Sequence, residues 1–346
     1  MSGERPPAGP GGSGQRCLIT GATGFIGSHI VQRLAAEGYR PRCLVRRTSE
    51  TSLLRTLGAE LVEGELTAPE TLPPAVNGCR LVVHCAALVS DWATPQEITS
   101  ANVSGTRNLL DACAGTSVTR FVHVSTTDVY GHPGGRDVDE RHQASGFSNW
   151  YAQTKLAAEA EVKRAAAERA LETVVLRPAT VYGPRSREVI LEITRAIRGG
   201  HMLLIDQGRA IAGLCYVQNL VDAVLLAIEH PAAVGEAFNV TDGLAVTWRE
   251  LTDALAAGLD CPPPRFSIPR APAELLGRVL EHGYRGLRSA TGLTTRPLLS
   301  RQAVQVMGVD QSFSNLKARS LLGWEPRVDY YRGLELTLDW LRSGAR

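Results

Sequence analysis

Apolar and polar positions alternate along the chain in a way that predicts strands joined by helices. Short apolar runs bounded by glycine or polar residues predict buried parallel strands. These runs are 17–19, 40–45, 59–63, 80–85, 120–125 and 171–176. Between them apolar residues recur at helical spacing, most clearly over 25–34, 98–114 and 150–170. Alternating strands and helices predict an α/β fold with a doubly wound parallel sheet.

Three glycines separate the first predicted strand from the first predicted helix. Gly21, Gly24 and Gly27 recur at three-residue intervals within CLITGATGFIGSHIVQRL, residues 17–34. Glycine permits a turn with positive φ, close approach of the backbone to a pyrophosphate, and close packing of helix on strand. The helix N-terminus adds N–H groups and a positive dipole end for phosphates. This arrangement predicts a dinucleotide site, and a tight structural turn is the alternative.

The pattern changes beyond residue 182, where helical spacing predominates and prolines become frequent. Two apolar stretches, 212–217 and 236–240, predict returns of the chain to the sheet. We therefore predict a Rossmann-type NAD(P)-binding domain followed by a smaller, mostly helical C-terminal substrate lobe. The predicted boundaries are a disordered tail over 1–14, the Rossmann domain over 15–182 completed by 206–242, and the substrate-binding lobe over 183–205 and 243–346.

Two arginines follow the second predicted strand, about 20 residues beyond the glycines. The residue at this position normally discriminates between NAD and NADP. An acidic residue there would bind the ribose 2′-hydroxyl of NAD, but Arg46 and Arg47 occupy the position. A guanidinium pairs well with the 2′-phosphate of NADP. We predict a preference for NADP(H), with NAD(H) as the second choice; solvated loop arginines are the alternative.

Tyr151 and Lys155 lie four residues apart in a predicted helix and therefore share one face. A phenol ordinarily titrates near pH 10, and a nearby ammonium with an oxidised nicotinamide stabilises the phenolate. Tyr151 would then act as an acid/base near neutral pH. A hydroxyl from Thr126 or Ser125, at the end of a predicted strand, would orient the substrate oxygen. A Tyr–Lys pair at this spacing is common on surface helices. The glycine motif and the Ser/Thr strand end that precede it in the chain favour a catalytic pair here.

The order of these motifs resembles the extended short-chain dehydrogenase/reductase family. TGATGFIG, STTDVYG (125–131), the Tyr151–Lys155 pair and RPATVYGP (177–184) carry the resemblance, which extends over residues 16–346. It implies that Tyr151 is the acid/base and that Lys155 lowers its pKa and binds the nicotinamide ribose. It also implies that the catalytic hydroxyl, more often a serine, is Thr126, with Ser125 nearby.

The same resemblance implies a cofactor site assembled from many short segments. Glu65 replaces the aspartate that contacts the adenine in the family, and Asn102 matches a buried amide near the active site. Plain packing is the alternative for the alanines after the fourth strand, and a satisfied core amide for the asparagine. The implied cofactor-binding residues are Gly21, Thr23, Gly24, Phe25, Ile26, Gly27, Arg46, Arg47, Glu65, Leu66, Ala86, Ala87, Asn102, Tyr151, Lys155, Pro178 and Val181.

The C-terminal region resembles the 3β-hydroxysteroid dehydrogenase branch, through 215–231, 236–251 and 298–326. That branch implies hydride transfer between NADP(H) and a ketone or secondary alcohol of a hydrophobic substrate, of steroid, terpenoid, polyketide or long-chain keto type. A nucleotide-sugar epimerase or dehydratase with recycled NAD(P) is the first alternative. A non-catalytic NADP-binding sensor or scaffold is the second.

Residues 262–300 carry apolar side chains at helical spacing, interleaved with arginines. The apolar positions predict a lid over a hydrophobic substrate: Phe266, Ile268, Leu275, Leu276, Val279 and Leu280. Arg278, Arg285 and Arg288 leave three interpretations open: a phosphate or carboxylate site, a solvated face, or an interfacial helix at a membrane.

Composition limits the remaining function classes. A formal net charge of +2 gives no reason to expect a nucleic-acid partner. The seven cysteines form no C-x-x-C pair, so we predict buried thiols in a reducing cytoplasm rather than disulfides or metal ligands. No stretch reaches the roughly 18 apolar residues of a membrane span. The family resemblance implies a homodimer through the helices at 98–114 and 150–170.

Overall fold

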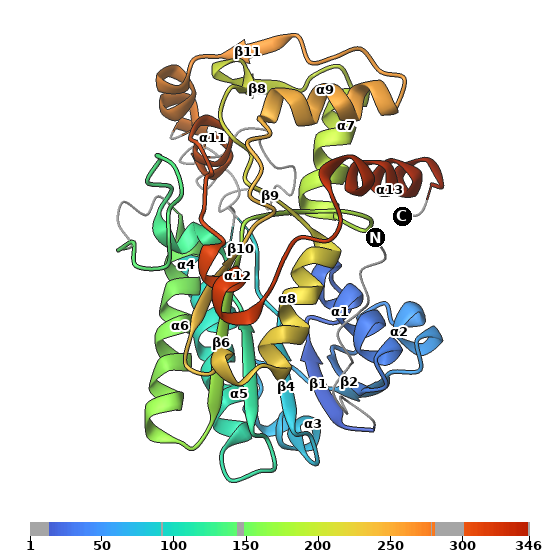
Figure 1. The fold of residues 1–346 in the computed structure, drawn as a ribbon, viewed down its shortest axis with the longest axis vertical. Helices are drawn as coiled ribbons and strands as arrows, with labels where there is room; N and C mark the ends of the chain where they lie inside the picture. The colour runs from blue at the N-terminus through green and yellow to red at the C-terminus, as the bar shows by residue number, and fades with distance from the viewer. Residues whose placement is uncertain (1–13, 91–92, 144–148, 278, 281–300, 345–346) are drawn as a thin grey trace, which may run out of the picture.

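The computed structural model describes residues 14–90, 93–143, 149–277, 279–280 and 301–344. Seven parallel strands form the central sheet in the order β10, β6, β5, β4, β1, β2, β3 (Figure 1). The strands are β1 (Arg16–Thr20), β2 (Arg40–Val45), β3 (Glu60–Glu63), β4 (Leu81–His84), β5 (Arg120–Val124), β6 (Glu172–Pro178) and β10 (Ala237–Val240). The predicted doubly wound sheet is confirmed. Apart from Gly14, the tail predicted to be disordered lies outside the described residues.

Helices cover both faces of this sheet. Successive residues of a strand point to opposite faces, so Ile19 joins the cluster that packs against α1 and α8, while Leu18 joins the opposite one. The first layer contains α1 (Phe25–Ala36) and α8 (Val217–Glu229), and the second contains α3 (Pro73–Val76), α5 (Gly105–Cys113) and α6 (Trp150–Glu168). Burial on both faces explains why the strands have nearly continuous apolar runs.

The helix predicted over 98–114 is divided into three parts. It comprises α4 (Pro95–Thr99), a π-helical turn (Ser100–Ser104) and α5. The wide turn carries Asn102, whose side chain bonds to Leu88 and Thr154. Such turns occur often at functional sites, and here the irregularity places a buried amide between α6 and the segment after β4.

The strand order reverses between β1 and β4, because β1 pairs with β2 on one side and with β4 on the other. Open α/β sheets bind ligands beyond the carboxyl ends of their strands at such a reversal. The glycine turn follows β1, and Ser125 and Thr126, the predicted catalytic hydroxyls, follow β5 at this same edge. The topology therefore brings the predicted motifs to one side of the sheet.

The upper region in Figure 1 is built mainly from helices above the carboxyl ends of the sheet strands. It contains α7 (Glu192–Arg198), α9 (Trp248–Gly258), α11 (Arg301–Gly308), α13 (Tyr330–Arg342) and a small sheet of β8 (Leu203–Ile205) with β11 (Phe266–Ile268). The shorter helices elsewhere are α2 (Ser52–Thr56) and α12 (Leu316–Leu322). This arrangement agrees with the predicted mostly helical lobe.

One predicted return of the chain to the central sheet is wrong. The stretch 212–217 forms β9 (Leu214–Tyr216), which pairs with β7 (Thr180–Tyr182) in a separate two-stranded sheet. The position beside β6 is occupied by β10, which pairs with it in parallel register. The other predicted return, 236–240, is therefore confirmed.

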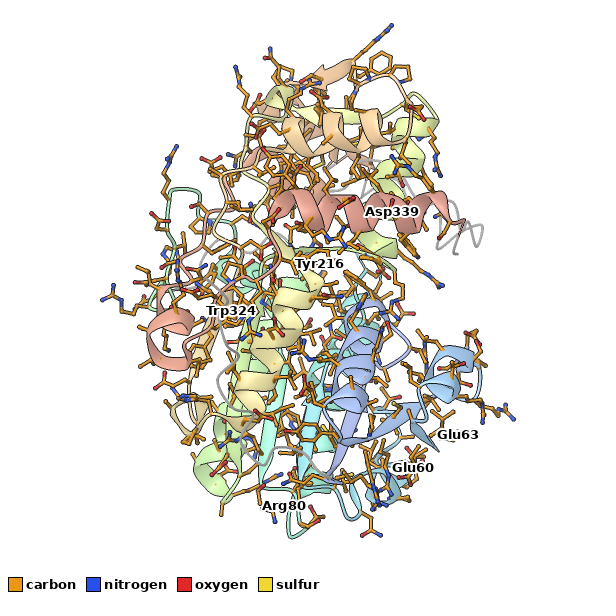
Figure 2. The ribbon with its side chains drawn as sticks, turned by 45° about the vertical axis from the view of Figure 1, so that its right-hand side comes forward. Glu60, Glu63, Arg80, Tyr216, Trp324 and Asp339 are labelled. Atoms are coloured by element: carbon orange, nitrogen blue, oxygen red, sulfur yellow. The ribbon has the colours of Figure 1, made fainter. Side chains whose placement is uncertain are left out.

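The C-terminal segment is tied to the sheet layer through α8. Trp324 is fully buried and donates from Nε1 to the carbonyl of Asn219 at 3.0 Å (Figure 2). The side-chain oxygen of Asn219 accepts from the backbone N–H groups of Arg327 and Val328. These contacts lock the chain that precedes α13 against the start of α8.

Several predicted lid residues are solvent-exposed. Phe266, Leu275, Leu276 and Val279 expose between 41% and 64% of their surface, while Arg278, Arg285 and Arg288 lie outside the described side chains. The lid stays a prediction. All seven cysteines are free thiols. Within the described ranges, no helix is both long and apolar enough to cross a membrane.

Candidate active site at the carboxyl edge of the sheet

The glycine turn has the close packing that its spacing predicts. Gly21 has φ +69°, and a Cβ added there would lie 2.8 Å from the backbone nitrogen of Ala86. A Cβ on Gly27 would lie 2.1 Å from the carbonyl oxygen of Gly21. No side chain caps the N-terminus of α1 at Gly24. The turn is a cradle of backbone that a dinucleotide pyrophosphate fits.

The segment after β4 lies directly beside this turn. The Ala86 N–H donates to the hydroxyl of Thr20 at 3.3 Å, so Ala86 and the following Ala87 flank the end of β1. Thr23 and Gly24 are exposed, whereas Phe25 and Ile26 are half-buried at the start of α1. Pro178 ends β6, and Val181 lies in β7 just beyond it. The structure thus gathers these predicted cofactor residues along one edge.

The two predicted 2′-phosphate residues follow β2 directly. Arg46 and Arg47 are exposed. Among the described residues neither guanidinium has a hydrogen-bond partner, and only the Arg46 backbone bonds to Ser49, in a turn. Glu65 is also exposed, and Leu66 is half-buried against the α5 layer. The arginines therefore have the position and freedom to bind an anion.

Asn102 links two parts of the site and does not point toward solvent. Its Oδ1 accepts from the Leu88 N–H at 2.7 Å, and its Nδ2 donates to the Leu88 carbonyl and the Thr154 hydroxyl. Both polar atoms of the amide are satisfied within the protein. The structure gives this residue the satisfied core arrangement that the sequence left as an alternative to cofactor contact.

Lys155 joins α6 to the carboxyl end of β5. Its Nζ donates to the Val124 carbonyl at 2.8 Å and lies 3.2 Å from Nε2 of His123. Tyr151 lies one turn earlier on the same helix, which Asn149 caps through the Ala152 N–H. The helix therefore presents Tyr151 and Lys155 to the strand end where the catalytic hydroxyls follow.

The two hydroxyls after β5 differ in their bonding. Thr126 Oγ1 accepts from the Asp128 N–H at 3.2 Å and caps the short helical turn Thr127–Tyr130. Its own proton is left for another acceptor. Ser125 is buried, and its hydroxyl has no hydrogen-bond partner among the described residues. Thr126 is half-buried at the crevice, which fits the role implied for it.

Burial shifts both catalytic pKa values toward the neutral forms. The pKa of Lys155 falls to about 8 because burial penalises the ammonium, while Glu159 opposes the shift. Burial, and then the charge of Asp128, raise the pKa of Tyr151 above its usual range. The protein groups alone therefore do not produce the lowered tyrosine pKa that the sequence predicted, because burial and the Asp128 charge both disfavour the phenolate.

Two histidines beneath the site escaped the sequence analysis. His84 and His123 are aligned on β4 and β5, with ring centroids 5.2 Å apart. The Thr106 hydroxyl donates its proton to the Asn102 carbonyl, so it accepts a hydrogen bond from His84 Nε2. The neutral His84 ring then has no proton on Nδ1, which accepts from the Thr20 hydroxyl. Burial lowers the pKa of both rings and keeps them neutral. The sequence signal that could have revealed them is a single histidine within each of the apolar runs 80–85 and 120–125.

A carboxylate beside the tyrosine was also missed. Asp128 lies two residues after Thr126, and its side chain is 17% exposed. Gln302 from α11 donates to it at 3.2 Å. The two residues lie 174 positions apart in sequence, so no local pattern connected them.

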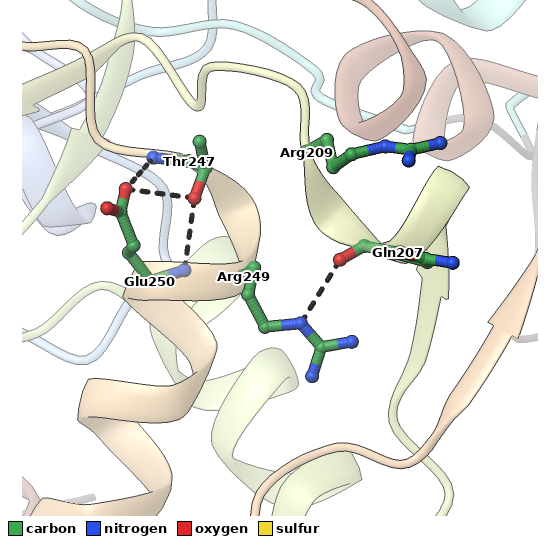
Figure 3. A pocket seen from close by; sticks show the side chains of 5 residues that line it. All are labelled: Gln207, Arg209, Thr247, Arg249 and Glu250. Carbon is green, nitrogen blue, oxygen red and sulfur yellow. Dashed lines mark hydrogen bonds between the residues drawn. The ribbon is translucent and has the colours of Figure 1, made fainter.

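A separate hollow in the upper region contains none of these residues. It measures about 410 Å³ and is lined by Gln207, Arg209, Thr247, Arg249 and Glu250 (Figure 3). Glu250 is engaged with Thr247 in a capping box, and Arg249 donates to the carbonyls of Gln207 and Pro264. Structural bonds therefore occupy most of its polar groups.

Comparison with known families agrees with this geometry. The profile described as the NAD dependent epimerase/dehydratase family matches residues 17–241. A 4-hydroxy-2-methyl-3-oxo-4-farnesyl-3,4-dihydroquinoline-1-oxide ketoreductase from Stigmatella aurantiaca is 32% identical, over 92% of this chain and 95% of the relative. A 2-alkyl-3-oxoalkanoate reductase from Stenotrophomonas maltophilia is 29% identical, over 92% and 97%. Other similar proteins are named 3-beta-hydroxysteroid dehydrogenases.

The fold also matches a solved structure with a dinucleotide in place. MoeE5 in complex with UDP-glucose and NAD superposes with a TM-score of 0.74 at 26% identity, over 96% of this chain and all of the other. The sequence-based resemblance to the extended short-chain family and to its 3β-hydroxysteroid dehydrogenase branch is therefore confirmed.

Proposed function

Because the chain belongs to the NAD dependent epimerase/dehydratase family and is an NAD(P)-dependent dehydrogenase/reductase, we propose that it is an NADP-preferring ketoreductase for a hydrophobic ketone. The observation that carries the proposal is the attachment of Lys155 to the end of β5, through the Val124 carbonyl at 2.8 Å. That bond fixes α6, which carries Tyr151 one turn before Lys155, against the end of the strand that Thr126 follows. The ketoreductase names of two relatives support the same reaction.

In the proposed reaction Tyr151 gives its phenolic proton to the carbonyl oxygen of the substrate. Thr126 donates a hydrogen bond to that oxygen and holds it in place, while Asp128 N–H fixes the orientation of the threonine. Lys155 carries the positive charge that compensates the phenolate left after proton transfer. NADPH, when bound, supplies the hydride. The raised pKa of Tyr151 in the protein suits a proton donor.

NADPH preference is supported by the free guanidinium groups of Arg46 and Arg47, placed after β2 where the adenosine ribose lies in this fold. The glycine cradle would hold the pyrophosphate against the start of α1.

The two ketoreductase relatives are named for different ketones. One name places a hydroxyl and a farnesyl group beside the keto carbon. The other describes a 3-oxo acid with an alkyl branch. The two names share a ketone on a molecule with apolar substituents, and we propose this general class, hydrophobic ketones, for the present enzyme. We also propose that it works in the cytoplasm as a homodimer through α5 and α6, which light scattering of the purified protein would test.

The proposal is tested by titrating the purified protein with NADPH and with NADH, then following the loss of reduced-nicotinamide absorbance with hydrophobic ketones. Tighter NADPH binding and stoichiometric oxidation are expected. Cofactor binding without net oxidation would contradict the ketoreductase and favour an epimerase or a sensor. Nucleotide sugars would then distinguish those two, because only an epimerase interconverts them.

A further inference from the structure

A group of polar side chains beside Tyr151 has no part in the chemistry described above. Asp128 begins the helical turn after β5, and its backbone bonds to Thr126 at 3.2 Å. The negative charge of its side chain contributes to the raised pKa of Tyr151. A carboxylate therefore lies within electrostatic reach of Tyr151, two residues after the hydroxyl of Thr126.

Two further side chains surround this carboxylate. Gln302 Nε2 donates to Asp128 Oδ2 at 3.2 Å, and His132 Nε2 lies 3.9 Å from Asp128 Oδ1. His132 Nδ1 bonds to Gln311 Oε1 at 3.0 Å, and the Gln311 amide nitrogen donates to the Val309 carbonyl. Because Gln311 offers its oxygen, Nδ1 carries the proton, and in the neutral His132 ring Nε2 is then an acceptor.

The group contains more acceptors than donors. Gln302 Oε1 and His132 Nε2 are buried, and neither has a hydrogen-bond partner among the residues that the structure describes. The ionised Asp128 carboxylate is itself an acceptor only. Buried acceptors without donors are costly, and each such group in a native protein calls for an explanation. The Asp128 side chain is partly exposed, so a ligand hydroxyl, which has a single proton to donate, would bond to its carboxylate.

We propose that Asp128, oriented by Gln302 and flanked by His132, accepts a hydrogen bond from a hydroxyl group next to the reacting carbonyl, so that the preferred substrates are α-hydroxy ketones. This proposal rests on the ketoreductase function above. The ketone carbon gains the hydride, its oxygen gains the proton of Tyr151, and the neighbouring hydroxyl is left unchanged. The products are a vicinal diol and the oxidised cofactor. A carboxylate next to the ketone would instead meet the like charge of Asp128.

The site also explains why a carboxylate is tolerated beside a catalytic tyrosine. Asp128 disfavours the phenolate, which keeps Tyr151 protonated and ready to donate. After transfer, however, the same charge would repel the phenolate that forms. A substrate hydroxyl that donates to the Asp128 carboxylate partly neutralises its negative charge during proton transfer, when that charge would destabilise the phenolate of Tyr151. A substrate without the hydroxyl lacks this compensation.

Three ketones of similar shape test the proposal: benzoin, its methyl ether and deoxybenzoin. In the wild-type enzyme we expect kcat/KM for benzoin to exceed that for deoxybenzoin by about tenfold, since a hydrogen bond to a charged group is strong. The methyl ether, which lacks the donor, should be no better than deoxybenzoin. In Asp128→Asn the preference should fall to about threefold or less, and benzoylacetate should become a better substrate. Asp139→Asn, a carboxylate paired with Arg141, is the matched control and should keep the wild-type ratio.

The ratio of two substrates does not depend on how much enzyme is active, so it separates recognition from folding. If Asp128→Asn fails to fold, Gln302→Leu gives the same readout with a smaller expected fall. Equal use of benzoin and deoxybenzoin by the wild type, or an unchanged ratio in the variants, would overturn the proposal and leave the ketoreductase standing. No NADPH oxidation with any ketone would overturn the proposed function itself.

Discussion

The cofactor side and the substrate side of this site are built in opposite ways. The cofactor side is mostly backbone: the turn at Gly21, the packing of Gly27 and the open start of α1 all occur within 17–34. The substrate side is mostly side chains from distant segments, as the bond between Asp128 and Gln302 shows. One half is therefore a local structure, and the other exists only after the chain has folded.

This difference determines what a mutation on each side can change. A Cβ at Gly27 collides with backbone only 2.1 Å away, so the cofactor cradle tolerates little variation. Gln302 reaches Asp128 with an exchangeable side chain from α11, outside the central sheet. We expect substitutions there to alter which ketones the enzyme accepts while the hydride chemistry is retained.

The largest expected effect lies where the two sides meet. Tyr151→Phe removes the proton donor and keeps the ring, so kcat should fall by about a thousandfold, within the range ascribed to general acid catalysis. NADPH affinity should change little, because the cradle and the arginines are untouched. Single-turnover absorbance measurements and a binding titration check both parts.

Tyr331→Phe is the matched control for that variant. Tyr331 is 80% exposed, so its loss of a hydroxyl should leave kcat unchanged. If Tyr151→Phe retained kcat within tenfold of the wild type, Tyr151 would not be the proton donor, and a different acid would have to be sought at the same edge.

The parts of the site that depend on local geometry could be predicted from the sequence. Helical spacing placed Tyr151 and Lys155 on one face, and glycine spacing identified the cradle. The order of strands and helices likewise predicted the sheet. In each case residues within one or two turns determine the structure.

The parts that depend on register and tertiary packing could not be predicted. His123 is one polar residue in an apolar strand, and its contact with Lys155 requires β5 and α6 to pack as they do. The stretch 212–217 has the apolar character of a sheet strand, yet β10 takes the place beside β6. Periodicity identifies an element but not its neighbour.

A smaller effect is expected from the arginines on the cofactor side. Replacing Arg46 and Arg47 together by serine should weaken NADPH binding by about tenfold and leave NADH binding nearly unchanged, because only NADPH carries the 2′-phosphate. The loss should shrink at high salt, since both side chains are exposed. Arg40→Ser, at the other end of β2, is the matched control. Equal losses of affinity for NADPH and NADH would show that Arg46 and Arg47 do not bind the 2′-phosphate.

The smallest predicted effect is a shift in the pH profile of kcat/KM. It tests the contact between His123 and Lys155, which lies beneath both the cofactor side and the substrate side. Neutral His123 accepts from Lys155, so His123→Leu leaves the buried ammonium with fewer acceptors and should lower its pKa further. Activity needs the charged lysine and is lost as pH rises through that pKa, which lies at about 8 in the protein. The alkaline limb of kcat/KM should therefore move about one unit to lower pH, since one pKa unit corresponds to about 1.4 kcal/mol, close to the value of one such bond. His123→Gln restores an acceptor and should restore the limb; identical profiles for the two variants would show that His123 only fills space.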